Sequence, residues 1–190
     1  MAPGNQVRII GGRHRGRRLH FAPVPGLRPT PDRVRETLFN WLQGEVHGSR
    51  CLDLYAGSGA LGLEALSRGA AALCAVEHNR SAAARLRQNL ALLAEGDRAE
   101  VVVDDVMRHL GRSAGAPFDI VFADPPFADP VLPELCRRLE RGGWLAAPAW
   151  IYLEQDANRP WEAFPAGWSL HREGVAGQSG YRLLRRNSPG

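Results

Sequence analysis

The chain has 190 residues, of which 44% are hydrophobic, so it is long enough for one well-buried domain with an extension and short for two full domains. No apolar run approaches the roughly 18 residues of a membrane span, and the arginine-containing N-terminus lacks the apolar segment of a signal peptide. The three cysteines, Cys51, Cys74 and Cys136, are widely spaced in apolar surroundings. We expect buried thiols of a cytoplasmic protein, and neither disulfides nor metal ligands.

Positive charge is concentrated near the N-terminus. Residues 1–40 contain eight arginines and two acidic residues, a net charge of 8 − 2 = +6, whereas residues 41–190 contain 16 arginines and 18 acidic residues, a net charge of −2. The chain has no lysine, which genome base composition alone could also produce. Because the planar guanidinium suits phosphate and stacked bases, the clustering favours contact with nucleic acid over an ordinary solvated surface.

The first elements in the chain predict a small basic ribbon. Residues 6–10 and 17–21 have the pattern of short strands, and a Gly11–Gly12 turn joins them. Arginines of this segment and of the linker behind it are the candidates for gripping RNA phosphates. They are Arg8, Arg13, Arg15, Arg17, Arg18 and Arg28.

A helix is expected next, because Thr30, Pro31 and Asp32 supply a hydroxyl cap, a proline at the first helical position and an acid in the first turn. We divide the chain after this helix, into an RNA-binding extension of residues 1–48 and a second domain of residues 49–190.

From residue 49 onwards, strands and helices alternate. Strands are expected at 51–55, 71–76, 100–103, 118–123 and 144–153. Helices are expected after residue 60, from the cap Ser81, at 106–110 and at 131–141. Two more strands, near 169–173 and 181–185, are separated only by residues 174–180, which implies an antiparallel hairpin. The order predicts a Rossmann-like, three-layer α/β sandwich with a mostly parallel seven-stranded sheet.

A glycine loop joins the first of these strands to its helix. Gly57, Ser58 and Gly59 allow a ligand to approach the backbone N–H groups at the helix N-terminus. The loop also fits the dinucleotide fingerprint, with Gly62 at the third glycine position and Glu77 about 20 residues on. By itself, the loop therefore does not distinguish one nucleotide cofactor from another.

Acidic residues at the strand ends identify the cofactor. Asp53, Glu77, Asp104 or Asp105, and Asp124 each follow or end a strand, and ligands of open α/β sheets bind at those ends. A carboxylate at Asp53 would attract the ammonium of S-adenosylmethionine and repel a pyrophosphate. Glu77 can accept both ribose hydroxyls and Asp105 the adenine amine. The predicted cofactor-binding residues are Asp53, Ala56, Gly57, Ser58, Gly59, Glu77, Asp105, Val106 and Asp124, with no metal.

The candidate catalytic motif is Asp124-Pro125-Pro126-Phe127. An exocyclic base amine is a weak nucleophile, because its lone pair is delocalised into the ring. The Asp124 carboxylate and a backbone carbonyl, expected to be that of Pro125, can accept its two N–H bonds and aim the lone pair at a methyl donor. The prolines restrict the backbone that carries these acceptors. Phe127 offers a flat face for stacking a base that has left its helix.

Four stretches of the sequence together resemble a known family. They are Arg8-Ile-Ile-Gly-Gly with Arg15-Gly-Arg-Arg-Leu19, Arg28-Pro-Thr with Val34 to Leu42, Asp53 to Gly62, and Asp124 to Phe127. They resemble the RsmD family of bacterial 16S rRNA (guanine-N2)-methyltransferases, over nearly the whole chain. The resemblance implies a class I methyltransferase fold and a monomeric enzyme that methylates the N2 amine of one guanine in the small ribosomal subunit or its assembly intermediate.

Two other functions fit parts of the pattern. The catalytic motif also occurs in adenine and glutamine methyltransferases, so transfer to another amide-like nitrogen, adenine N6 or a protein glutamine, is the alternative. The N-terminal arginines favour RNA over a protein substrate. A non-catalytic RNA-binding assembly factor would need only the fold, and the joint presence of Asp53, Glu77 and Asp124 argues against it.

Overall fold

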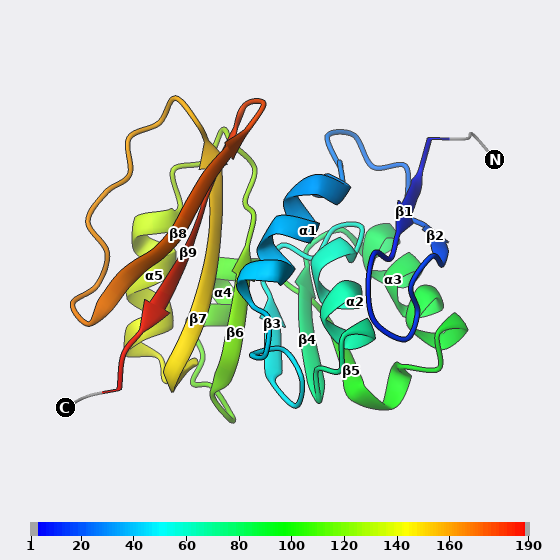
Figure 1. Cartoon of the computed structure of the whole chain (residues 1–190), viewed down its shortest axis with the longest axis horizontal. Helices are drawn as coiled ribbons and strands as arrows, with labels where there is room; N and C mark the ends of the chain where they lie inside the picture. Colours follow the sequence, from blue (N-terminus) through cyan, green and yellow to red (C-terminus); the bar gives the residue numbers. More distant parts are fainter. Residues whose placement is uncertain (1–3, 189–190) are drawn as a thin grey trace.

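The computed structural model describes residues 4–188, and its centre is a seven-stranded sheet. The strands lie in the order β5-β4-β3-β6-β7-β9-β8; the first five are parallel, and β9 is antiparallel to both neighbours (Figure 1). Their bounds are β3 Arg50–Asp53, β4 Ala72–Glu77, β5 Ala99–Val103, β6 Phe118–Ala123, β7 Leu145–Asp156, β8 Trp168–Ala176 and β9 Ser179–Arg186. The predicted sheet is confirmed.

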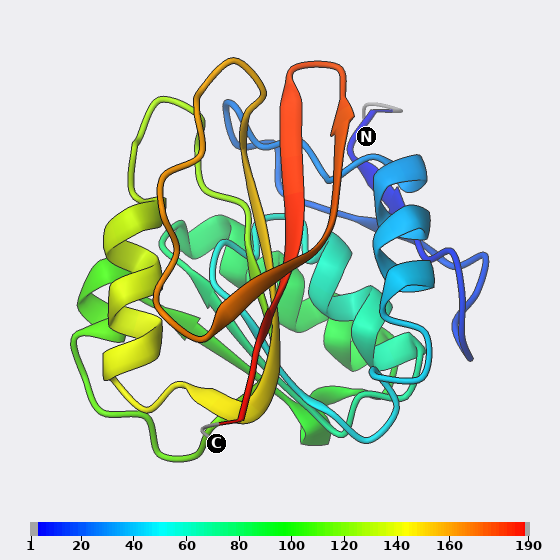
Figure 2. The same ribbon diagram turned by 60° about the vertical axis from the view of Figure 1, so that its left-hand side comes forward.

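Helices cover both faces of the sheet, which gives the three predicted layers (Figure 2). Residues of α1, α2 and α3 join one hydrophobic cluster on one face, and residues of α4 and α5 join a second cluster on the other. The helices are α1 Asp32–Trp41, α2 Ala60–Ser67, α3 Arg80–Leu92, α4 Val106–Leu110 and α5 Leu132–Arg141, with a 3₁₀ turn at Gly96–Arg98. Within residues 4–188, none of the helices has the length and apolar character needed to cross a membrane.

The two clusters follow from the alternation of side chains along each strand. Phe122 and Tyr152, which pair across β6 and β7, pack in the cluster of α1. The next pair, Ala123 and Leu153, packs in the cluster of α5. Because both faces are covered, these strands read as continuous apolar runs in the sequence.

The N-terminal ribbon consists of β1 (Gln6–Arg8) and β2 (Arg18–His20), which are antiparallel and shorter than predicted. Val7 and Leu19 are each 3% exposed and belong to the same hydrophobic cluster as α1, α2 and α3. The ribbon is therefore packed against the main body, and the division of the chain at residue 48 stays a prediction.

Both predicted helix caps were wrong. Pro31, with φ −55° and ψ 148°, is itself the cap of α1, and no side chain caps this helix, so Thr30 is left for another role. Asn79, and not Ser81, caps α3, and its Oδ1 accepts a hydrogen bond from the N–H of Ala82 at 3.0 Å. In each case the extended residue before the first helical turn lies one or two positions from the expected cap.

The hairpin between β8 and β9 is tighter than predicted. Its strands extend until only Gly177 and Gln178 connect them. Gly177 has φ +58°, a conformation that suits a two-residue hairpin turn and that glycine adopts without strain.

The three cysteines are free thiols buried in the core, as predicted. Cys51, Cys74 and Cys136 are 0%, 9% and 2% exposed, and burial raises the pKa of each thiol to about 12.

Candidate active site

The glycine loop leads from β3 to α2 at the carboxyl ends of the parallel strands. Gly57 and Gly59 have φ values of +52° and +80°, a region that other residues rarely adopt. A Cβ atom at Gly59 would lie 2.5 Å from Leu86 Cδ1, so packing against α3 also requires glycine. Ala56 and Ser58 are buried within the loop. The backbone angles of the two glycines and the packing against α3 therefore both fix the shape of the loop.

Asp53, the last residue of β3, lies below this loop. Its side chain is buried, and Oδ2 accepts a hydrogen bond from the N–H of Gly62 at 3.1 Å. Burial raises the pKa of Asp53 to about 7; the hydrogen bond from Gly62 opposes the increase, and the charge of Glu77 adds to it. Among the described residues, Asp53 forms no salt bridge. A buried carboxylate without a cation is suited to bind an ammonium group.

Glu77, the last residue of β4, closes the other side of the loop. Its Oε2 accepts the N–H of Gly57 and its Oε1 the N–H of Asn79, each at 2.8 Å. These two backbone donors fix the carboxylate, and each oxygen keeps a second lone pair. Glu77 can therefore still accept hydrogen bonds from two neighbouring hydroxyls.

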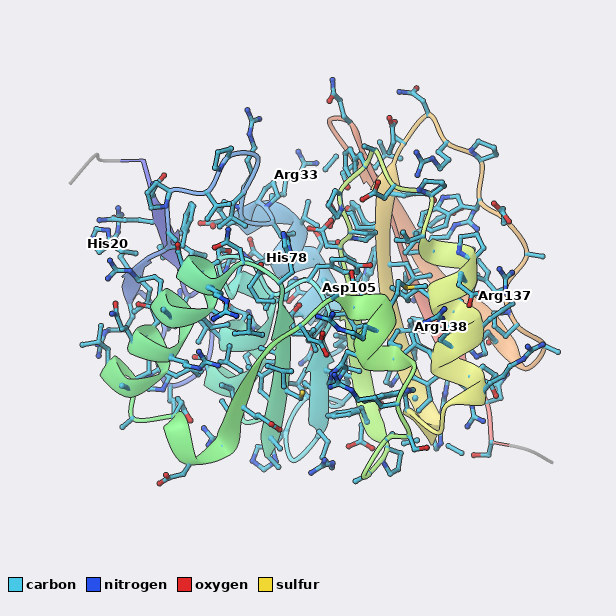
Figure 3. The ribbon with its side chains drawn as sticks, turned by 180° about the vertical axis from the view of Figure 1, so that it is seen from behind. His20, Arg33, His78, Asp105, Arg137 and Arg138 are labelled. Carbon is cyan, nitrogen blue, oxygen red and sulfur yellow. The ribbon has the colours of Figure 1, made fainter. Side chains whose placement is uncertain are left out.

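Of the two acids after β5, Asp105 is the accessible one. Asp104 is buried and forms salt bridges with Arg108 and Arg112, the latter at 2.7 Å. Asp105 is exposed and caps α4, where its Oδ1 accepts the N–H of Arg108 at 2.9 Å (Figure 3). Val106 begins α4, so its N–H has no acceptor within the helix. Asp105 and Val106 thus offer one acceptor and one donor side by side.

The catalytic motif directly follows β6. Asp124 and Phe127 are partly exposed, Pro125 is buried and Pro126 is exposed. The motif lies between two buried strands, β3 and β7, which both pair with β6.

The carboxyl group of Asp124 has unusual surroundings. Burial raises its pKa well above the ordinary value, and the charges of Glu154 and Asp53 add to the increase. The hydroxyl of Thr30 faces Asp124 as a hydrogen-bond donor, and this contact opposes the increase in the pKa. The residue expected to cap α1 therefore faces the candidate catalytic carboxyl group instead.

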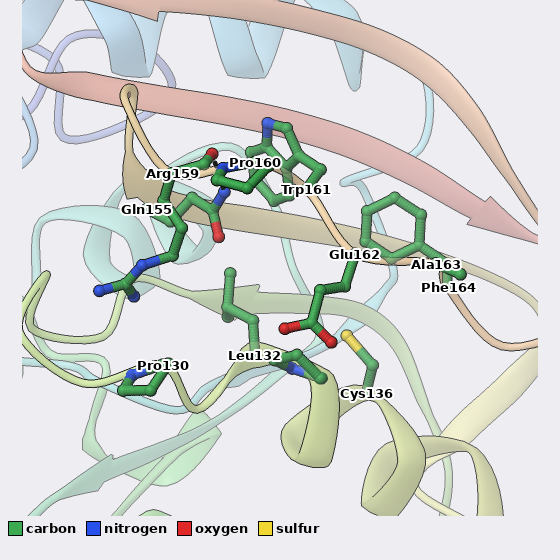
Figure 4. Close-up of a pocket in the computed structure, with 11 residues that line it drawn as sticks. Pro130, Leu132, Cys136, Gln155, Arg159, Pro160, Trp161, Glu162, Ala163 and Phe164 are labelled. Atoms are coloured by element: carbon green, nitrogen blue, oxygen red, sulfur yellow. Dashed lines mark hydrogen bonds between the residues drawn. The ribbon is translucent and has the colours of Figure 1, made fainter.

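The loop between β7 and β8 contacts the backbone at Phe127, the last residue of the motif. Nη2 of Arg159 donates to the carbonyl of Phe127 at 2.8 Å. Figure 4 shows the second contact, in which the carbonyl of Arg159 accepts a hydrogen bond from Gln155 at 2.8 Å. Trp161 and Phe164 line a pocket beside this contact. None of the predicted site residues lines that pocket, and the sequence analysis did not single out Arg159.

The six arginines predicted to contact RNA are exposed, but they have different partners. Arg8 forms a salt bridge with Asp32 at 3.0 Å. Arg13 forms one with Glu95, whose carboxylate is fully buried. Within residues 4–188, the following form no salt bridge: Arg15, Arg17, Arg18 and Arg28. In the basic arm (residues 8–18), Arg13 is therefore an anchor, and Arg15, Arg17 and Arg18 face solvent.

Glu64 of α2, which the sequence analysis did not single out, is the main attachment point of this arm. Its side chain is 0% exposed. The carboxylate accepts the N–H of Ile10 at 2.9 Å and that of Gly11 at 2.8 Å. It also accepts hydrogen bonds from the guanidinium groups of Arg35 at 3.2 Å and Arg68 at 2.9 Å.

Arg35 of α1 extends the same network and is 1% exposed. Besides Glu64, it donates to the carbonyls of Thr30 at 3.0 Å and Arg8 at 2.8 Å, and to Asp32. This guanidinium thereby fixes the backbone of Thr30, whose hydroxyl faces the catalytic motif. A charged residue inside an apolar helical run, as Glu64 is, was the signal available in the sequence.

The residues at this edge fit S-adenosylmethionine. Asp53 lacks a cation and would meet the ammonium, Glu77 would accept the ribose hydroxyls, and Asp105 with Val106 would contact the adenine. The same carboxylates would repel the pyrophosphate of a dinucleotide.

Comparisons with known proteins show the family of the chain. A family model described as conserved hypothetical protein 95 matches residues 7–185. Ribosomal RNA small subunit methyltransferase D of Escherichia coli (strain K12) is 52% identical over 185 residues, 97% of this chain and 92% of that protein. The protein of the same name from Haemophilus influenzae is 42% identical over 182 residues, 95% of this chain and 94% of that protein.

Solved structures give the same result. A putative methyltransferase from Escherichia coli has a TM-score of 0.87 at 53% identity, covering 97% of this chain and 99% of that chain. A putative methylase from Haemophilus influenzae has a TM-score of 0.82 at 40% identity, covering 96% and 99%. The chain therefore belongs to the RsmD family, the family of ribosomal RNA small subunit methyltransferase D.

Proposed function

We propose that the protein transfers a methyl group from S-adenosylmethionine to the exocyclic N2 amine of one guanine in 16S rRNA, within the small ribosomal subunit or an assembly intermediate. The observation that carries this proposal is the position of Asp124 to Phe127 at the same sheet edge as Asp53 and Glu77. The relatives' name, ribosomal RNA small subunit methyltransferase D, supports rRNA as the substrate.

Bound S-adenosylmethionine would supply the methyl group as an electrophile. The task of the protein is then to orient a weak nucleophile. Asp124 and the carbonyl of Pro125 would accept the two N–H bonds of the amine, which favours a nitrogen lone pair directed out of the ring plane. Positive charge develops on the amine during transfer, and the Asp124 carboxylate would stabilise it.

The target base must leave its stack to reach Asp124. Phe127 is partly exposed, its carbonyl is held by Arg159, and its ring would stack on the extruded base. Arg15, Arg17 and Arg18 would contact phosphates around it. We further propose that the enzyme acts as a monomer in the cytoplasm and needs no metal ion.

The test is to incubate the protein and labelled S-adenosylmethionine with small subunits that lack the modification, and to locate the methyl group by nuclease mapping and mass spectrometry. We expect it on N2 of a single guanine. A label on adenine or on protein would overturn the assignment in favour of another amide-like nitrogen. Absence of S-adenosylmethionine binding in calorimetry would favour a non-catalytic assembly factor.

One substitution tests the role of the motif. Asp124→Ala should abolish methyl transfer and leave the affinity for S-adenosylmethionine largely intact, because Asp53 and Glu77 remain. Asp97→Ala, which removes an exposed carboxylate before β5, is the matched control and should be fully active. Full activity of Asp124→Ala would exclude the amine-orienting role.

A further inference from the structure

A buried carboxyl group, that of Glu154, lies beside Asp124. Ala123 of β6 pairs with Leu153 of β7, so the next residues, Asp124 and Glu154, occupy adjacent positions on strands about 4.8 Å apart. Side chains alternate along a strand, so both carboxyl groups return to the face covered by α1. The charge of Glu154 acts directly on Asp124.

Glu154 is held in place by two hydroxyl groups. The Tyr152 hydroxyl donates to Oε2 at 2.9 Å, and the Ser179 hydroxyl donates to Oε1. The side chain of Glu154 is 4% exposed, and within residues 4–188 it forms no salt bridge. Burial raises the pKa of Glu154, and the two hydroxyls, which donate to the carboxylate, oppose that increase and favour the charged form.

We propose that Glu154, held by Tyr152 and Ser179, is a positioning residue that makes Asp124 the proton acceptor for the methylated amine. The inference rests on the proposed function and assigns the step that follows methyl transfer. Two carboxylates this close, without a cation, are not both ionised at low cost. Negative charge on Glu154 therefore increases the proton affinity of Asp124.

The proton balance of the step is simple. The amine nitrogen forms a bond to the methyl carbon while the carbon–sulfur bond breaks, and the electron pair of that bond stays on sulfur. The nitrogen is then cationic and carries two hydrogens. One N–H bond breaks, its electrons return to nitrogen, and the proton forms an O–H bond on Asp124. When the product has left, that proton passes to water and Asp124 is ionised again.

Other groups face the pair and determine the sign of the pH effect. Asp53 from β3 adds negative charge. Burial raises the pKa of Tyr152 on β7 well above its ordinary value, so its hydroxyl is neutral, and Tyr181 of β9 lies opposite Glu154. Two neutral hydroxyls also face the pair, that of Thr30 at Asp124 and that of Ser179 at Glu154. Because Asp124 must be ionised to accept the amine, the rate should rise with pH through the pKa of Asp124. Removing the charge of Glu154 lowers that pKa and moves the acidic limb to lower pH.

The experiment compares Glu154→Gln with the wild-type protein in single-turnover methylation of unmodified small subunits across pH. We expect the acidic limb to move down by at least one pH unit, a tenfold change in proton affinity. The control Glu173→Gln, which removes an exposed carboxylate on β8, should leave the limb in place. An unchanged limb in Glu154→Gln would overturn the inference.

A measurement without catalysis provides a second readout. Carbon-13 NMR of labelled aspartate in the protein alone should show the Asp124 carboxyl titrating at least one pH unit lower in Glu154→Gln. If that variant does not fold, Tyr152→Phe removes one donor to Glu154 and should shift Asp124 in the same direction by a smaller amount. No shift in Tyr152→Phe would then refute the coupling. If wild-type protein methylates no guanine but the NMR shift occurs, the proposed function fails and the carboxyl coupling stands.

Discussion

Replacing Glu64 by glutamine removes one negative charge from the point where the basic arm meets α2. The carboxylate of Glu64 receives four donors: two backbone N–H groups, from Ile10 and Gly11, and two guanidinium groups, from Arg35 and Arg68. An amide in its place has one oxygen, and its NH₂ group would face at least one of these donors. Arg35, which is 1% exposed, would also lose its salt bridge to a fully buried carboxylate and keep the one to the half-exposed Asp32.

The magnitude follows from the burial of the pair. Removing one partner of a buried salt bridge costs about 3–5 kcal/mol. Two unsatisfied buried donors at about 1–3 kcal/mol each give a similar figure. At about 2–4 °C per kcal/mol for a chain of this size, the melting temperature should fall by about 6–20 °C.

The assay is urea unfolding followed by fluorescence, with Glu134→Gln as the control. Glu134 on α5 also pairs with two arginines, but its side chain is 44% exposed, so its replacement should leave the unfolding midpoint unchanged. Hydrogen exchange locates the effect: the amides of Ile10 and Gly11 should lose more protection than those of β6. The reasoning is refuted if Glu64→Gln unfolds at the same urea concentration as Glu134→Gln.

Three further predictions concern ligand binding and the pH dependence of stability. Burial raises the pKa of Asp53 to about 7, and only the ionised form attracts an ammonium. Below that pKa, the affinity for S-adenosylmethionine measured by calorimetry should therefore increase about tenfold for each unit by which the pH is raised. Asp53→Asn should bind weakly at every pH, and a wild-type affinity that does not depend on pH would contradict this prediction. Because Asp53 has a higher pKa in the folded protein than in the unfolded chain, the unliganded protein should lose stability as the pH rises through about 7. Thermal unfolding of Asp53→Asn should show a smaller loss of stability over the same pH range. Arg15→Gln with Arg17→Gln should reduce the salt dependence of RNA binding by about 1.4 to 1.8 in log–log slope. The paired control, Arg137→Gln with Arg141→Gln on α5, should not change it, and an unaltered slope in the arm variant would place the phosphate contacts elsewhere.

Much of the sheet could be predicted from the sequence, because its signals are local. From Ile120 to Ala123, β6 is apolar on both faces, and it is bounded by a motif that cannot continue a strand. The glycine loop could also be predicted, because Gly57 and Gly59 adopt backbone angles that few other residues tolerate. The acids at the strand ends were found because parallel strands bring their carboxyl ends to one edge.

The buried charges could not be predicted, because their partners are distant in sequence. Arg35 on an amphipathic helix reads as a solvated residue until Glu64, 29 positions away, is placed against it. Glu95 reads as a loop residue, yet its carboxylate is fully buried between Arg13 and Arg98. Only the tertiary fold supplies such pairs.

Thr30 shows a related difficulty with local rules. Its hydroxyl before Pro31 and Asp32 fits a helix cap, but the extended Pro31 turns Thr30 towards Asp124. The capping preference is worth about 1 kcal/mol, and tertiary contacts overrode it here. Glu154 was overlooked for a similar reason, because it lies at the end of an apolar strand whose pattern gives no reason to single it out.

The burial of all three cysteines has a practical consequence. A thiol reacts as its thiolate, and at pKa values of about 12 almost none of Cys51, Cys74 or Cys136 is ionised at neutral pH. Maleimide dyes and spin labels should therefore leave the native protein unmodified. A single reactive thiol introduced by Arg15→Cys would then carry the probe alone, so that fluorescence or electron paramagnetic resonance can follow the basic arm as RNA binds, with every native cysteine kept.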